Sequence, residues 1–200
     1  MSDSLSRRKL ARAAAKLAVA SASRLPALVL MTDDERLPDP IGAAKALPRG
    51  SMVVVRARDG RRRGQLGEAM TKIARARGLF VLIAGDSALA LKLGADGVHL
   101  PEARIGEAAR LRARYRFMVT AAVHSLAALR KTQWLDAAFL SPVLPTASHP
   151  GRAALGPLRA ASVARQSPVP VFALGGITAA NAGRLCGFSG IAAIGALSVS

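Results

Sequence analysis

Short, continuously apolar runs alternate with segments of helical periodicity along nearly the whole chain. The runs lack the polar alternation of a half-exposed sheet, which indicates strands that are buried on both faces, as in parallel sheets. The predicted strands are residues 27–31, 52–55, 79–84, 97–100, 117–121, 137–140, 169–174 and 191–194. The predicted helices between them are residues 39–47, 65–77, 87–93, 105–114, 126–132, 158–166 and 179–185.

This alternation predicts eight strand–helix units, of which only the last helix is missing. Repeated units with buried strands allow a doubly wound open sheet or a (β/α)8 barrel. Eight units favour the barrel, and the first strand is not followed by the glycine-rich turn of a dinucleotide-binding sheet. No linker-like stretch divides the chain. We therefore expect an α/β fold with one compact (β/α)8 TIM barrel over residues 25–200 and a missing or truncated eighth helix.

Residues 1–24 form a basic, alanine-rich segment ahead of the barrel. Its apolar stretch, residues 17–22, is too short for a secretion signal and is flanked directly by Lys16. We expect a basic N-terminal helix here. Because the first and last strands of a closed barrel are neighbours, this helix is a candidate to fill the gap left by the eighth helix.

The charge balance points to an anionic partner. The chain carries 29 Lys and Arg against 12 Asp and Glu, a formal net charge of +17, which suits a phosphate, a carboxylate, a nucleic acid or a membrane surface. Nucleic acid is disfavoured because aromatic residues make up only 4% of the chain and no binding motif is present. No apolar run is long enough to span a membrane. The single Cys186 excludes an internal disulfide and fits a reducing, cytoplasmic compartment.

The ends of the last two predicted strands are rich in glycine. The chemistry of a barrel lies where strands end, and the loops after strands 7 and 8 often bind phosphate. Gly175 and Gly176 follow strand 7, and Gly195 and Ala196 follow strand 8, so backbone N–H groups can approach an anion there. Tight turns without a ligand are the alternative. The hydroxyls of the loop after strand 6 are further candidate donors, from Thr146 and Ser148.

Two arginines follow the second predicted strand directly. The guanidinium groups of Arg56 and Arg58 match phosphate oxygens, so one or both are candidates to bind a diphosphate. A solvent-exposed loop is the alternative.

All three histidines lie at or just after strand ends, at a spacing of 25 residues: His99, His124 and His149. A three-histidine zinc site is chemically possible, but a shared position does not by itself bring side chains together, and we expect no metal site of this kind. His99 is as well explained by burial in the core. His124 is the candidate for acid–base catalysis, because imidazole titrates near neutral pH.

Three longer motifs carry a family resemblance. They are residues 94–100 (GADGVHL), residues 141–148 (SPVLPTAS) and residues 170–177 (PVFALGGI) with Asn181. In this order and spacing they make residues 28–198 similar to the thiamine phosphate synthase / thiazole tautomerase superfamily. The resemblance implies a compact (β/α)8 barrel and an enzyme of thiamine biosynthesis. Synthase members join hydroxymethylpyrimidine diphosphate to a thiazole phosphate and release pyrophosphate, with Mg²⁺ as cofactor.

The resemblance also implies roles for the residues at the strand ends. The thiazole phosphate would lie on the backbone of Gly176, Gly195 and Ala196, with Thr146 and Ser148 as hydroxyl donors. Arg56 and Arg58 match the Arg and Lys of the family's motif after strand 2. His149 stands where the family has a lysine.

The chain departs from the family at the metal site. The two matching metal carboxylates are replaced by Gly85 and Arg104, and Val54 replaces a glutamine after strand 2. Asp86 and Glu102 lie one and two positions from the lost ligands and are possible substitutes, so Mg²⁺ is expected only in a true synthase.

Loss of the metal ligands favours other functions within the same family. The tautomerase branch moves a proton on a thiazole phosphate carboxylate without a metal, and its histidine after strand 5 matches His124. A barrel that binds a phosphorylated ligand without turnover is the third alternative. The expected partners are a thiazole phosphate and, for a synthase, the pyrimidine diphosphate.

Overall fold

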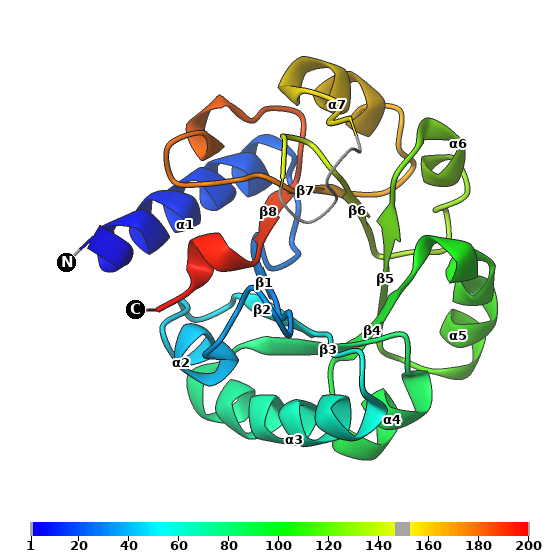
Figure 1. Cartoon of the computed structure of the whole chain (residues 1–200). Coiled ribbons are helices and arrows are strands. Elements are labelled where there is room, and N and C mark those ends of the chain that lie inside the picture. Colours follow the sequence, from blue (N-terminus) through cyan, green and yellow to red (C-terminus); the bar gives the residue numbers. More distant parts are fainter. Residues whose placement is uncertain (1, 147–152, 200) are drawn as a thin grey trace.

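Eight parallel strands close into a barrel in the computed structural model, which describes residues 2–146 and 153–199. Each strand pairs with its neighbours in sequence, and the last strand pairs with the first (Figure 1). The strands are β1 (Leu28–Met31), β2 (Met52–Val55), β3 (Phe80–Ala84), β4 (Gly97–Leu100), β5 (Met118–Val123), β6 (Ala137–Leu140), β7 (Val171–Leu174) and β8 (Gly190–Ala193). The predicted (β/α)8 barrel is confirmed.

Helices surround the barrel on its outside (Figure 1). The α-helices after the first strand are α2 (Pro40–Lys45), α3 (Gly60–Arg77), α4 (Ser87–Leu93), α5 (Ala108–Arg114), α6 (Leu126–Leu129) and α7 (Pro157–Ala164). Three 3-10 segments complete the set: η1 (Glu102–Glu107), η2 (Ala182–Arg184) and η3 (Gly195–Leu197).

Three predicted helices are shorter or tighter than expected. The helix predicted over residues 126–132 is only the four-residue α6. The helix predicted over residues 179–185 is only the 3-10 turn η2, because Asn181 binds the loop backbone with its side chain and Gly183 disfavours a helix. The helix predicted over residues 105–114 starts as the 3-10 segment η1 and becomes α5 only at Ala108.

Local capping sets the helix boundaries. The Asp59 side chain accepts the Arg62 N–H at 2.7 Å, so α3 starts five residues before the predicted helix. Gly78 ends α3, and Gly94 ends α4, each in the left-handed conformation that glycine adopts without strain. Because α3 ends at Gly78 and α4 ends at Gly94, the chain leaves each helix there, and β3 and β4 begin two and three residues later.

The barrel interior is filled by large apolar side chains. Phe139 and Phe172 stack at 5.1 Å between ring centroids, and the ring of His99 packs edge-on against Phe139. His99 is only 4% exposed, and its Nδ1 lies 2.9 Å from the hydroxyl of Thr120. Burial, together with the nearby charge of Arg56, lowers the pKa of His99 to about 3. His99 is therefore a neutral residue of the barrel interior.

The N-terminal helix α1 (Ser2–Ala20) lies in the place of an eighth helix. It packs against β8, β1, η2 and η3, and only the short η3 follows β8 (Figure 1). Leu10, Ala14 and Leu17 form its buried stripe at helical spacing. Arg7 Nη1 donates to the carbonyl of Ser198 at 3.0 Å and ties α1 to the C-terminal segment.

Among the described residues, no helix combines the length and apolar character needed to cross a membrane.

Candidate functional site

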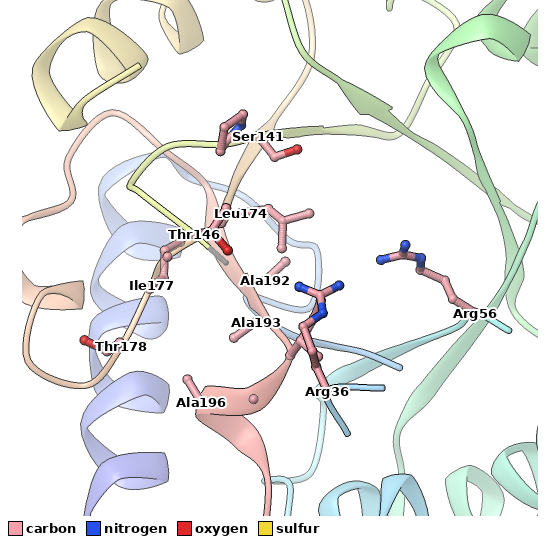
Figure 2. A pocket seen from close by; sticks show the side chains of 15 residues that line it. Arg36, Arg56, Ser141, Thr146, Leu174, Ile177, Thr178, Ala192, Ala193 and Ala196 are labelled. Carbon is pink, nitrogen blue, oxygen red and sulfur yellow. The ribbon is translucent and has the colours of Figure 1, made fainter. Parts of the chain in front are cut away.

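A cavity of about 370 Å³ opens at the carboxyl ends of the strands. It is lined by segments that follow β1, β2, β6, β7 and β8 (Figure 2). The polar and glycine residues of its wall are Arg36, Arg56, Ser141, Thr146, Gly175, Gly176, Thr178 and Gly195. Apolar residues of β7 and β8 complete it, among them Leu174 and Ala192. This is the face of a barrel on which ligands bind.

The loop after β7 is shaped by two glycines and one asparagine. Gly175 and Gly176 have φ angles of 95° and 66°, and a Cβ on Gly176 would overlap the carbonyl oxygen of Pro145. Asn181 Nδ2 donates to the carbonyl of Gly176 at 2.9 Å, and Asn181 Oδ1 accepts the N–H of Thr178 at 2.8 Å. The loop is therefore held in one conformation. In the described part of the chain, the N–H of Gly176 has no backbone acceptor.

The loop after β8 presents a second pair of backbone donors. Gly195 and Ala196 begin η3, and the first N–H groups of a helical segment have no acceptor within it. A Cβ built on Gly195 meets nothing closer than the carbonyl oxygen of Arg36 at 3.8 Å, so this backbone is open to a ligand. We call Gly175, Gly176, Gly195 and Ala196 the glycine cradle. The structure brings all four residues and Thr146 to one cavity.

Arg56 carries a positive charge into the same cavity. Its backbone is fixed by Thr32, whose hydroxyl accepts the Arg56 N–H and donates to the Arg56 carbonyl, each at 2.7 Å. Its guanidinium forms no ion pair with any carboxylate that the structure describes. Burial lowers the pKa of Arg56 from its usual value. A half-buried guanidinium without a carboxylate partner is a site for an anionic ligand.

Arg36 is a cavity residue that the sequence analysis missed. It lies in the loop after β1, where its Nε donates to Asp33 Oδ1 at 3.1 Å and its Nη2 pairs with Asp33 Oδ2. Burial alone would raise the pKa of Asp33, but the hydrogen bonds from Arg36 outweigh it and hold this pKa at about 2. The i, i+3 spacing of Asp33 and Arg36 just after the first strand was the available signal. Figure 2 shows both guanidinium groups at the cavity, with that of Arg56 pointing toward Arg36.

Other predicted site residues lie elsewhere. The Arg58 side chain is 84% exposed and pairs with Glu35 at 2.7 Å, outside the cavity. His124 lines a separate hollow with Leu155 and Arg159, on the side of α7. Ser148 and His149 lie outside the described residues. Ser141, which the sequence analysis did not select as a site residue, lines the cavity and contacts His124.

The residues at the family's metal positions do not fit Mg²⁺. Arg104 Nη1 donates to the carbonyl of Gly85 at 2.7 Å, so a guanidinium joins the two positions at which the resemblance implies metal carboxylates. The same guanidinium is paired with Glu107. Mg²⁺ prefers oxygen ligands that include carboxylates, and a cation at this place repels it.

The two possible substitute carboxylates have other roles. Asp86 Oδ1 accepts the N–H of Leu89 at 2.8 Å as the cap of α4, and Asp86 Oδ2 lies 3.9 Å from Arg63. Glu102 Oε2 accepts the backbone N–H of His124. Within residues 2–146 and 153–199, no group of three or more His, Cys, Asp or Glu side chains is placed to hold a metal ion.

Comparisons with known proteins agree with the fold and the cavity. Residues 28–197 match the family model described as thiamine monophosphate synthase. The thiamine-phosphate synthase of Thiobacillus denitrificans (strain ATCC 25259 / T1) is 32% identical over 176 residues, which cover 82% of this chain and 82% of that protein. That of Chlorobium luteolum (strain DSM 273 / BCRC 81028 / 2530) is 32% identical over 185 residues, 86% of this chain and 85% of that protein.

A solved structure shares the architecture. The thiamine phosphate pyrophosphorylase from Pyrococcus furiosus superposes with a TM-score of 0.68 at 21% identity, over 84% of this chain and 85% of that one. At this identity the likeness concerns the fold. The family match spans the barrel from β1 to η3 and includes every described segment that lines the cavity, so the chain belongs to the thiamine monophosphate synthase family.

Proposed function

We propose that the protein is an enzyme of thiamine biosynthesis that binds a thiazole phosphate in the cavity, with the phosphate on the glycine cradle. The observation that carries the proposal is the convergence of Gly176, Gly195 and Ala196 on one cavity. Backbone N–H groups without internal acceptors bind phosphate oxygens without requiring a charged side chain. The open space beside Gly195 leaves room for the phosphate.

Arg36 and Arg56 support a second anionic group on the ligand. Both line the cavity; Arg36 is ion-paired with Asp33, whereas Arg56 forms no ion pair with any carboxylate in the described part of the chain. Two guanidinium groups in one cavity repel each other, and an anion between them relieves that repulsion and supplies the acceptors that Arg56 lacks. A carboxylate on the thiazole ring, or the diphosphate of a pyrimidine substrate, would supply this second anionic group.

The residues around the cavity favour a reaction that needs no divalent metal. The positions of the family's metal carboxylates are joined by Arg104, and the charged side chains of the cavity wall are arginines. The proposed reaction is therefore tautomerisation of a thiazole phosphate carboxylate. One proton leaves the ligand and one returns at another atom, so the composition is unchanged and no co-reactant is required.

Two assays separate this reaction from the coupling reaction of the family. In the first, the protein is incubated with the thiazole phosphate, hydroxymethylpyrimidine diphosphate and Mg²⁺. In the second, it receives the thiazole tautomer alone with a metal chelator. We expect product in the second assay only. Mg²⁺-dependent formation of thiamine phosphate in the first would contradict the metal-free proposal, and no product in either would leave ligand binding without turnover.

Binding itself is tested by titration calorimetry with the thiazole phosphate. We expect Gly195→Val to weaken binding, because a branched side chain fills the open space beside the cradle. Arg58→Gln is the matched control, since Arg58 is exposed and lies outside the cavity. Equal affinity of the wild type and Gly195→Val would remove the cradle from the phosphate site.

A further inference from the structure

Ser141 and His124 form a contact that joins the cavity to a residue outside it. Ser141 follows β6 directly, is only 6% exposed and lines the cavity (Figure 2). His124 follows β5 and lines the neighbouring hollow instead. His124 Nδ1 lies 2.9 Å from the Ser141 carbonyl oxygen and 3.1 Å from the Ser141 hydroxyl oxygen.

These two distances determine which nitrogen of His124 carries a proton. A carbonyl oxygen only accepts hydrogen bonds, so the 2.9 Å contact requires a proton on Nδ1. The hydroxyl oxygen of Ser141 accepts a share of the same proton. The Ser141 hydroxyl therefore acts as an acceptor toward His124, and its own proton is directed elsewhere. The cavity is the open space that Ser141 faces.

The backbones of both residues are held in place. Ser141 N–H donates to the Val123 carbonyl at 3.0 Å, and His124 N–H donates to Glu102 Oε2. Arg159, on α7, faces the hollow beside the imidazole ring. In the described part of the chain, His124 Nε2 has no hydrogen-bond partner. The imidazole is thus anchored through Nδ1 and through its own backbone.

We propose that Ser141 is a ligand-binding residue whose hydroxyl donates to an acceptor atom of the thiazole phosphate, and that His124 is a positioning residue that fixes the direction of this hydroxyl. The inference rests on the proposed function for the identity of the ligand. In this proposal the glycine cradle and the two arginines bind the anionic groups of the ligand, and Ser141 hydrogen-bonds to its uncharged part. In this role His124 acts through Ser141.

Substitutions that replace one imidazole nitrogen at a time test the role of His124. An asparagine side chain places an N–H near the position of Nδ1, and a glutamine side chain places one near Nε2. By calorimetry with the thiazole phosphate, we expect Ser141→Ala and His124→Gln each to weaken binding about tenfold, the effect of one hydrogen bond. His124→Asn restores most of that loss. Ser162→Ala, in the same hollow as His124, is the control and binds as the wild type does.

The double variant Ser141→Ala/His124→Gln tests whether His124 acts through Ser141. We expect it to bind no more weakly than Ser141→Ala alone. The inference would be overturned if the two single variants' losses of affinity multiplied in the double variant. It would also be overturned if His124→Gln bound with wild-type affinity, or if His124→Asn bound as weakly as His124→Gln. Unfolding temperatures of all variants show whether the fold is intact.

Nitrogen-15 NMR of His124 tests the inference without any ligand. We expect the proton of the neutral ring on Nδ1, and a proton on Nε2 would overturn the positioning role. If the wild type fails to bind the thiazole phosphate while the proton is on Nδ1, the proposed function fails and the Ser141–His124 contact stands. The two failures are thereby distinguishable.

Discussion

The two sides of the cavity are built from different chemistry. The glycine cradle offers backbone N–H groups, and after Asp136 the chain has no acidic residue at all. The loop after β1 instead holds Arg36, which is paired with Asp33, and outside the cavity the segment after β4 holds Arg104, which is paired with Glu107. Backbone donors tolerate sequence change as long as the glycines remain, whereas a site made of side chains is altered by single substitutions. We therefore expect the glycine cradle to be the more tolerant of substitution at neighbouring positions.

The largest effect that we expect concerns His99, beneath Arg56. Its pKa is about 3 in the folded protein against the usual 6.5 of a free histidine, so the unfolded chain binds an additional proton between these values. The resulting stability is complete above about pH 6.5 and is lost as the pH falls toward 3. We expect the stability difference between the wild type and His99→Asn to shrink by about 3 kcal/mol from pH 7 to pH 4. Urea unfolding at each pH measures it, and a constant difference would contradict burial of neutral His99.

Gly176→Ala tests the cradle side. The added Cβ overlaps the Pro145 carbonyl at a positive φ, which we expect to cost about 2–3 kcal/mol of folding free energy. Gly195→Ala is the matched control, because its Cβ meets open space and its effect on stability stays within about 0.5 kcal/mol. Denaturant unfolding of both variants measures the contrast. Equal stability losses would show that the two loops are not shaped as described.

Arg56→Gln tests the arginine side. Arg56 is half-buried in the cavity without an ion-pair partner among the described carboxylates, so its loss should weaken the binding of a ligand with two anionic groups by about tenfold or more. Inorganic phosphate, which needs only the cradle, should bind the variant nearly as well as the wild type. Calorimetry with both ligands separates the two sides. An equal loss for both would place the phosphate on Arg56 instead.

The smallest expected effect is that of Mg²⁺. Because a guanidinium joins the positions of the metal ligands, millimolar Mg²⁺ should not raise the unfolding temperature of the free protein. Ca²⁺ at the same concentration is the control for nonspecific ionic effects. A saturable stabilisation by Mg²⁺ alone would require that Arg104 leave Gly85.

The sequence was sufficient to predict the barrel because every strand is a continuous apolar run, and each observed strand lies within two residues of its predicted position. That the glycines lie together was predictable because the carboxyl ends of all strands of a barrel share one face; their binding of phosphate stays a prediction. Arg36 was missed because its direction depends on the salt bridge with Asp33, and the pairing of Arg58 with Glu35 depends on two loops that are distant in sequence. The direction in which the His124 side chain points relative to β6 depends on packing, and no local sequence pattern predicts it.

We propose that the backbone of the glycine cradle holds the phosphate, and amide NMR reports on that backbone itself. Titration of the nitrogen-15-labelled protein with the thiazole phosphate should shift the N–H signals of Gly176, Gly195 and Ala196 in one saturable transition, and Gly195→Val should abolish these shifts. Saturable binding that moves none of the three signals would contradict the account.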